Sequence, residues 1–416
     1  MFAVYAEKPD FESPISGLRV GERPEPKIPA GWVRVKVSHA SLNRNDIFTL
    51  RGITAHESIP FPMILGNDGV GTLDDGSEVI IYPVMGGADW RGDETLDPEW
   101  HIFSEKVPGT FADYVAVPRR NAIPKPPEIS ALEASVLGTA WLTANRALFT
   151  KARLQPGQTL LVQGATGGMS TALIQLARAA GVETWVTSRS REGRSLAERL
   201  GARRTFGMNE ALPSRVDAVI DNIGQATWGH SLQSVRAGGT VVTVGITTGN
   251  DPSANLLRLI AEKITIIGSI MGTREEMNDL IYFMVKSKIR PEIGKVVPME
   301  QAGEAIREMI DGRTHGKTVF TRCRSRPPRR RGDAGLTFVE RRHRSRQELH
   351  ARFAQSTAAW RFPPPDLHVF AGIQANVQAN VHGNSASKGL PRGLATFRPG
   401  LGHPVTGSPA WPGEIP

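Results

Sequence analysis

Cysteine is almost absent from this chain, since Cys323 is the single one among 416 residues. One thiol cannot form an intrachain disulfide, and it cannot supply the several thiolates on which many zinc sites are built. Long apolar runs are missing as well. Nowhere do about 18 apolar residues follow one another, and the N-terminal stretch MFAVYAEKPD lacks the apolar run of a signal peptide. We therefore expect a cytoplasmic protein without a membrane span.

The excess of basic charge is confined to the C-terminal part of the chain. The formal net charge is +9, but residues 321–416 hold 15 Lys and Arg against 5 Asp and Glu, which leaves residues 1–320 nearly neutral. Residues 322–416 are rich in Arg, Pro and Gly, so they bury too little apolar surface to offset ordering entropy, and we expect a mostly disordered tail. Nucleic-acid binding would rest on this tail alone. A solvated extension, or sequence never selected to fold, is the alternative.

Two regions with different hydrophobic periods precede the tail. Residues 1–122 predict a small β-rich domain, because apolar and polar residues alternate in 31–40 and strand-like runs follow at 77–84 and 111–118. From residue 123 to 265 a helical pattern at 131–151 gives way to apolar strands that alternate with amphipathic helices. The expected strands are 159–163, 183–187, 216–221 and 239–245, and the expected helices are 169–180, 190–200 and 226–235. Such alternation is typical of βαβ units around a parallel sheet.

Residues 266–321 complete the predicted fold. A strand at 264–270, helices at 274–286 and 299–311 and a last strand at 317–321 are expected there. The segment GRTHGKT at 312–318 has a spacing close to that of a phosphate-binding P-loop. It has three residues between its glycines instead of four and leads into a strand rather than a helix, so we expect no nucleotide site at this segment.

The strongest chemical signal is the segment TLLVQGATGGMSTALIQLARAAG at 159–181, where a buried strand meets a Gly-rich turn and a helix. Small residues let the backbone approach a pyrophosphate, and the N–H groups that open the helix favour an anion. The G-x-G-x-x-G pattern is incomplete, and a turn without a ligand is the alternative. The candidate cofactor-binding residues here are Ala165, Thr166, Gly167, Gly168 and Met169.

The end of the second strand of this unit indicates which dinucleotide is bound. An NAD site would place Asp or Glu there for the ribose 2′-hydroxyl, but the chain reads TSRSREGR at 187–194. Ser188, Arg189 and Arg194 can instead bind a 2′-phosphate, which an Arg contacts through several donors. We therefore predict NADPH rather than NADH, unless these arginines only decorate a solvated helix start.

Several motifs together resemble the medium-chain dehydrogenases/reductases, and specifically the zinc-less branch that is similar to quinone oxidoreductases and enoyl reductases. The motifs are SLNRNDIFTLRG (41–52), PMILGNDGVGTL (62–73), GTFADYVAVP (109–118), LGTAWLTANRAL (137–148), VDAVIDNIG (216–224) and GGTVVTVG (238–245). The resemblance spans residues 1–321. It implies an α/β fold in which a chaperonin-10-like β-rich catalytic domain is interrupted by a Rossmann domain with a doubly wound parallel sheet.

The resemblance also implies that zinc is absent. Family members with catalytic zinc place Cys three residues before Asp in the first motif and His in a Gly-His-Glu of the second, where this chain has Asn43 and Asn67. The lobe that carries structural zinc in the family corresponds to residues 86–106, which hold no cysteine. Amides are poor zinc ligands, so we expect no metal. A chance gathering of His39, Asp46 and Asp68 is the alternative.

The implied reaction is hydride transfer from NADPH to an electron-poor acceptor, a quinone or an α,β-unsaturated carbonyl. By resemblance, Asn43 and Asp46 are the catalytic candidates, and the amide of Asn43 would donate a hydrogen bond to the carbonyl oxygen or else only fix its loop. Thr139 and Thr143 resemble nicotinamide contacts, and Asn222, Gly245 and Thr247 follow strands at the edge where a dinucleotide lies. Phe48 stands where related quinone reductases often carry Tyr, so a phenolic proton donor is lost at that position. Solvent is the alternative proton source, and no residue is assigned as the acid.

Two other functions stay open: an alcohol dehydrogenase with a cryptic metal site and a non-catalytic NADP-binding protein. A homodimer is expected from the family and is favoured by the apolar run at 264–270.

Overall fold

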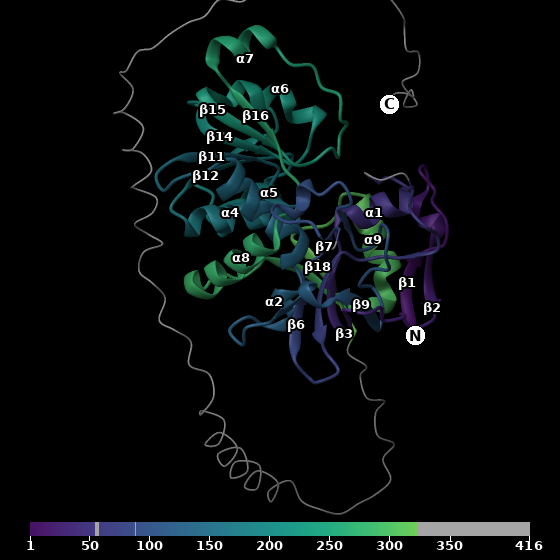
Figure 1. The fold of residues 1–416 in the computed structure, drawn as a ribbon. Helices are drawn as coiled ribbons and strands as arrows, with labels where there is room; N and C mark the ends of the chain where they lie inside the picture. Colours follow the sequence, from purple (N-terminus) through teal and green to yellow (C-terminus); the bar gives the residue numbers. More distant parts are fainter. Residues whose placement is uncertain (55–57, 88, 323–416) are drawn as a thin grey trace, which may run out of the picture. The chain divides into compact units, whose positions relative to one another are not determined.

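A six-stranded parallel sheet is formed by strands between Thr159 and Gly268 (Figure 1). In this computed structural model, which describes residues 1–54, 58–87 and 89–322, the strand order is β13-β12-β11-β14-β15-β16. The strands are β11 (Thr159–Gln163), β12 (Glu183–Ser188), β13 (Arg204–Gly207), β14 (Val216–Asp221), β15 (Val235–Thr243) and β16 (Thr265–Gly268). Helices α4 (Gly168–Ala179) and α5 (Arg191–Leu200) cover one face, and α6 (Gln225–Ser234) and α7 (Leu256–Glu262) cover the other. The predicted doubly wound sheet is confirmed.

A second, mostly antiparallel sheet is formed by the two ends of the described chain. Its order is β10-β6-β5-β3-β18-β17, with β9 also paired to β3. The strands are β3 (Trp32–Ser41), β5 (Asp68–Thr72), β6 (Glu78–Ile81), β9 (Tyr114–Pro118), β10 (Ala122–Pro124), β17 (Ile293–Pro298) and β18 (Lys317–Thr321). The last strand thus returns to the N-terminal sheet, as the resemblance implied. The domain boundaries 1–122, 123–265 and 266–321 themselves stay predictions.

Strand β18 places its first residue beside the loop that follows β3. Val319 lies opposite Ser41 in the antiparallel register, and Leu42 N donates to Thr318 O at 2.9 Å. At the other sheet, Gly316 N donates to Thr166 O at 2.8 Å. The start of β18 therefore contacts both the loop after β3 and the turn after β11.

The helical pattern predicted at 131–151 folds as one irregular helical segment. It consists of α2 (Ala131–Ala134), π-helical turns at Leu137–Trp141 and Arg146–Lys151, and α3 (Leu142–Asn145) between them. Trp141 in this segment is fully buried in the core that joins the two halves. Most residues of this segment are buried, so no single apolar stripe shows where the helix changes to π-helical turns. The sequence pattern therefore predicted a helix but not its irregularity.

Several short elements were not predicted. They are β1 (Phe2–Ala6), β2 (Leu18–Glu22), α1 (Arg44–Arg51), β4 (Met63–Ile64), β5, β7 (Val84–Met85), β8 (His101–Ile102), β10, β13, α7 and β17. Helices α8 (Arg274–Ser287) and α9 (Ala302–Ile310) were predicted. Arg322, which was assigned to the tail, belongs to the folded part: its Nε donates to Asp113 Oδ1 at 2.8 Å and its guanidinium lies 3.9 Å from the ring centroid of Phe2. The predicted disorder of residues 323–416 lies outside the described residues.

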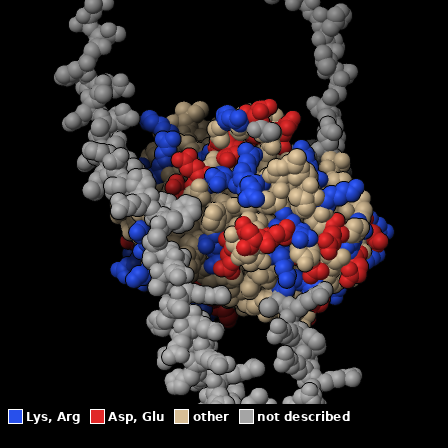
Figure 2. Space-filling view, turned by 60° about the horizontal axis from the view of Figure 1, so that its bottom comes forward, with Lys and Arg blue, Asp and Glu red and all other residues tan. Residues whose placement is uncertain are grey.

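Basic side chains do not gather on the face that Figure 2 shows, where Lys and Arg are interspersed with Asp and Glu. This agrees with the near-neutral charge of residues 1–320 and gives the described part no continuous basic patch on that face. Within the described ranges, the structure contains no helix of the length and apolar character that a membrane crossing needs.

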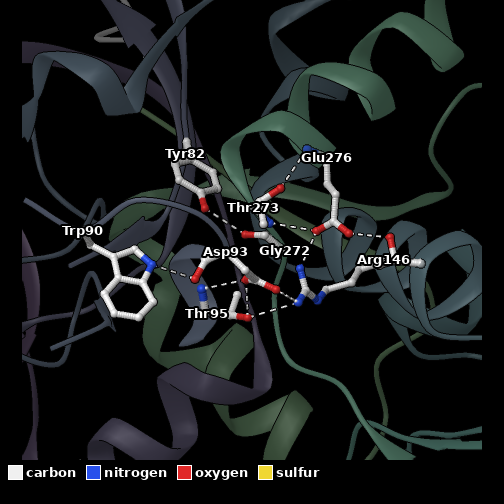
Figure 3. A network of polar contacts seen from close by, with 9 residues as sticks. Tyr82, Trp90, Asp93, Thr95, Arg146, Gly272, Thr273 and Glu276 are labelled. Atoms are coloured by element: carbon white, nitrogen blue, oxygen red, sulfur yellow. Dashed lines mark hydrogen bonds and ion pairs between the residues drawn. The ribbon is translucent and has the colours of Figure 1, made fainter. Parts of the chain in front are cut away.

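A buried arginine ties the lobe at 86–106 to helix α8 (Figure 3). Arg146 Nη1 contacts Glu276 Oε2 at 2.7 Å, and Nη2 contacts Asp93 Oδ2 and, at 3.2 Å, Thr95 Oγ1. Only 2% of the Arg146 side chain is exposed. Tyr82 OH adds a bond of 2.8 Å to Gly272 O, just before α8. A buried ionic cluster therefore joins the lobe at 86–106 to the start of α8.

Arg146→Met should lower the free energy of unfolding by about 3 kcal/mol, because Asp93 and Glu276 would then face each other without the cation. Arg236→Met is the matched control, since the Arg236 side chain is 46% exposed in its pair with Asp217, and it should cost less than about 1 kcal/mol. Urea unfolding at pH 7 measures both. Equal losses in the two variants would contradict a structural role for the buried cluster.

Candidate functional site

The turn between β11 and α4 has the features of an anion site. Helix α4 begins after Gly167, and no side chain caps its first N–H groups. A Cβ at Gly167 would come no closer than 4.0 Å to another atom, Ser170 Oγ, so the space beside this glycine is open. The free N–H groups and the helix dipole favour a negatively charged group here.

This turn lies at the point where the sheet order reverses. The chain runs from β11 outward to β12 and β13 and then returns to β14, which pairs with β11 on its other side. Asn222, directly after β14, donates from Nδ2 to Ser170 Oγ at 2.9 Å. Gly245 follows β15 and packs on Asn222, because a Cβ there would lie 2.2 Å from Asn222 O. Ligands of open α/β sheets bind at such a switch point. Thr247 lies two residues further along and is exposed.

The segment predicted to select the dinucleotide adjoins the turn. Ser188 ends β12 and is buried, and Arg194 Nη1 donates to its carbonyl oxygen at 3.3 Å. A Cβ at Gly193 would lie 2.3 Å from Ser188 Oγ and 3.1 Å from Thr166 Cγ2. The start of α5 therefore packs tightly beside the phosphate-binding turn, while Arg189 is exposed.

Hydrogen bonds fix the side-chain amide of the catalytic candidate Asn43. It precedes α1 and is 5% exposed. Its Nδ2 donates to Asp68 Oδ1 at 3.0 Å and to Ser41 O at 3.1 Å, which uses both amide hydrogens. Ser41 Oγ also donates to Asp68 Oδ1 at 2.7 Å. To donate to a substrate oxygen, Asn43 must therefore give up one of these two bonds.

The oxygen of the same amide accepts from a residue that the sequence reading did not propose. Lys317 Nζ donates to Asn43 Oδ1 at 2.6 Å and to Leu42 O at 2.8 Å, and Lys317 is only 2% exposed. Burial lowers the pKa of Lys317, while the charges of Asp68 and Asp46 raise it. No sequence signal identified it, because the segment around Lys317 indicated a strand start and the pairing with Asn43 spans most of the chain.

Asp46 stabilises the loop of Asn43 through buried hydrogen bonds. It is fully buried, and its two oxygens accept from Asn43 N and Gly66 N, each at 2.8 Å. Burial raises the pKa of Asp46 to about 7, against the effect of these hydrogen bonds. The carboxylate has no exposed surface through which it could touch a substrate, so this geometry fits a supporting role better than the predicted catalytic one.

The two threonines predicted beside the nicotinamide reach the same network. Thr139 N donates to Asp68 Oδ2 at 3.2 Å, and Thr143 Oγ1 donates to Thr139 O at 2.7 Å. The hydroxyl of Thr139 is buried without a hydrogen-bond partner in the described part of the chain. Such a group is costly unless a ligand pairs with it, so it fits a contact to a bound cofactor.

Amides stand at two positions, Asn43 and Asn67, where the resemblance would place metal ligands, and amides are poor zinc ligands. Asn67 is fully buried: its Nδ2 donates to Phe103 O at 2.5 Å, and its Oδ1 has no hydrogen-bond partner in the described part of the chain. Among the described residues, no three His, Cys, Asp or Glu side chains lie close enough together to hold a metal ion. His39, the third member of the alternative set, bonds through Nδ1 to Ser38 Oγ at 3.1 Å. An ammonium next to Asn43 would also repel a divalent cation.

Comparisons with known proteins agree with this architecture. Residues 29–127 match the alcohol dehydrogenase GroES-like domain, and residues 168–286 match the zinc-binding dehydrogenase family. Acryloyl-coenzyme A reductase of Metallosphaera sedula is 28% identical over 326 residues, which are 73% of this chain and 96% of that protein. Quinone oxidoreductase of Mus musculus is 30% identical over 230 residues, or 51% and 68% of the two chains. A crystal structure of an NAD-dependent alcohol dehydrogenase has a TM-score of 0.72 at 28% identity and covers 77% of this chain and 99% of that one.

The fold and the site define an oxidoreductase that uses a pyridine nucleotide, with a GroES-like catalytic domain and a Rossmann sheet. The chain belongs to the medium-chain dehydrogenase/reductase family. The predicted fold class is therefore confirmed. Its assignment to the zinc-less branch, its preference for NADPH and the roles of the individual site residues stay predictions.

Proposed function

We propose that the protein is a zinc-independent, NADPH-dependent reductase of a quinone or an α,β-unsaturated carbonyl. The observation that supports this proposal is the buried hydrogen-bonded set of Asn43, Asp68 and Lys317, in which an amide stands where the resemblance would place a metal-binding Cys. An amide and an ammonium polarise a carbonyl less strongly than zinc does, so the acceptor that suits this site is already electron-poor. Two relatives are named acryloyl-coenzyme A reductase and quinone oxidoreductase, and acceptors of these kinds have that property.

Each group of the candidate site would have its own role in this reaction. NADPH would supply the hydride, with its diphosphate at the open N–H groups of Gly168 to Ser170. The unpaired hydroxyl of Thr139 would bind the nicotinamide side of the cofactor. Asn43 would contact the carbonyl oxygen of the acceptor by exchanging its bond to Ser41 O, and Asp46 would hold the loop. The electron-poor acceptor would take up the hydride from NADPH, and a proton would complete its reduction. Because Phe48 has no hydroxyl to donate that proton, we assign it to solvent.

Purified protein should oxidise NADPH in the presence of a quinone such as 1,4-benzoquinone, or of an enal or enoyl thioester such as acryloyl-coenzyme A. Activity should be unchanged after dialysis against 1,10-phenanthroline, and elemental analysis should find less than about one tenth of a zinc ion per chain. Ethanol and NADP⁺ should give no turnover. Stoichiometric zinc that is required for turnover would favour an alcohol dehydrogenase. Tight NADPH binding without turnover of any acceptor would favour a non-catalytic binding protein.

The preference for NADPH rests on the side chains after β12. Ser188 and Arg194 adjoin the turn after β11, so they would lie near the adenosine ribose of a dinucleotide bound there, and Arg189 adds an exposed guanidinium. No acidic side chain ends β12 to bind a 2′-hydroxyl. A 2′-phosphate therefore has cationic donors, whereas an unphosphorylated ribose has no carboxylate partner.

Arg194→Ala should raise the Kd of NADPH at least tenfold and leave the Kd of NADH within about twofold, because the 2′-phosphate alone would lose a charged donor. Arg215→Ala is the control, since Arg215 is exposed and paired with Glu262. Fluorescence titration with each nucleotide measures the change. An equal loss for both nucleotides, or none for either, would contradict the assignment of Arg194 to the phosphate.

We also propose a homodimer in which β16 of one chain pairs with β16 of its partner. Among the described strands, β16 ends the parallel sheet, so one edge of it has no partner within the chain. Exposed apolar side chains adjoin it, including Leu257 and Ile260 of α7, which are 77% and 75% exposed. Two copies of one edge strand are self-complementary under a two-fold axis.

Sedimentation should give about twice the chain mass of 45.2 kDa. The double change Leu257→Glu and Ile260→Glu should shift the protein to the monomer, because charge would replace the apolar contact. Leu96→Glu is the control, since Leu96 is 68% exposed in a different lobe. A monomeric wild type, or a double variant that stays dimeric, would exclude this interface.

A further inference from the structure

Lys317 contacts both the phosphate-binding turn and the loop of Asn43. Its aliphatic part lies against the turn, since a Cβ at Gly168 would be 2.4 Å from Lys317 Cδ and 3.1 Å from Cγ. Its ammonium bonds to Leu42 O and Asn43 Oδ1. The backbone strengthens this link, because Gly316 N donates to Thr166 O at 2.8 Å.

The ammonium fixes which way the Asn43 amide faces. Lys317 donates to Oδ1, and Asp68 accepts from Nδ2. If the amide were flipped, its oxygen would face the carboxylate and its NH₂ would face the ammonium, and both contacts would be repulsive. One cation and one anion thus select a single orientation of the amide. Without the cation, only the bonds to Asp68 and Ser41 would oppose a rotation.

Burying this charge is costly, so its presence calls for a reason. A buried ammonium needs partners for its hydrogens and a nearby anion, and a neutral side chain of the same size avoids this cost. The only acceptors that the described structure gives to Lys317 Nζ are on the loop of the catalytic candidate. Met would fill the same volume beside Gly168 without a charge, so packing alone does not explain a lysine at this position.

We propose that Lys317 is a positioning residue for hydride transfer, and that it holds the amide of Asn43 in register with the cofactor bound at the adjoining turn. The inference rests on the proposed reductase function. Lys317 acts through Asn43 and is not itself assigned a contact with the reacting atoms. A misplacement of about 1 Å in such a site can lower a rate by about 100-fold.

The test is a double-mutant cycle that combines Lys317→Met with Asn43→Ala in the full-length protein. Lys317→Met keeps the aliphatic contact with Gly168, so we expect the Kd of NADPH within about threefold of wild type and kcat lower by about 100-fold. In the Asn43→Ala background the same change should lower kcat less than about threefold, because the group that Lys317 positions is already absent. The primary isotope effect with NADPH deuterated at the transferred position should increase in Lys317→Met.

The control is Lys295→Met, which removes a half-exposed lysine of β17 paired with Glu308 and should leave kcat unchanged. Lys317→Gln is a second neutral variant for the case that Met disturbs folding, which thermal unfolding monitors. Wild-type kcat in Lys317→Met, or fully additive losses in the cycle, would overturn the inference. Loss of NADPH binding in both Lys317 variants would make the residue structural and overturn it as well. Absence of wild-type turnover would instead refute the proposed function, before any variant is compared.

Discussion

The buried ammonium of Lys317 joins the loop that carries Asn43 to the turn where α4 begins, and the geometry of the candidate site depends on this contact. The two sheets are separate hydrogen-bonded units, and each leads into one of these two segments. The loop after β3 carries Asn43, and the turn after β11 carries Gly167 and Gly168. Strand β18 belongs to the antiparallel sheet, and its first residue lies against the turn after β11 of the parallel sheet. The side chain of Lys317 can therefore contact both the loop and the turn. Its charge is balanced by nearby carboxylates, so the register of the loop and the turn is set by directional bonds and not by packing alone.

A second buried cation stabilises the molecule away from the cleft. Arg146 holds Asp93 in the lobe at 86–106 and Glu276 at the start of α8. Each of the two cations lies near two carboxylates, Asp46 and Asp68 for Lys317 and Asp93 and Glu276 for Arg146. Side-chain ion pairs fix geometry through several weak directional bonds, whereas a metal fixes it through a few strong ones. At both places this chain fixes geometry with a buried cation. Zinc independence of the whole protein nevertheless remains a proposal.

Much of the fold could be predicted because it depends on local patterns. The strand β11, the glycine turn and α4 follow each other within 159–181, and the structure places all three within a residue or so of the prediction. The strand at 317–321 was also located correctly. The contact of Lys317 with Asn43 could not be predicted, because it joins residues that are distant in the chain, and a lysine at the start of a strand is ordinarily solvated. The pairing of Arg146 with Asp93 could not be predicted either, because these two residues are also distant in the chain. The amide bonds of Asn43 were beyond sequence reasoning too, since a motif names a residue but does not show where its hydrogens point.

The most direct measurement is a crystal structure of the full-length protein grown with NADPH and with zinc salt in the solution. The account predicts diphosphate density at the first turn of α4 and the Lys317 ammonium still bonded to Asn43 Oδ1, with no tetrahedral metal between Asn43 and Asp68. A metal ion at that position, with the lysine displaced, would contradict the central claim. Cofactor density that avoids the turn at Gly167 would contradict it equally.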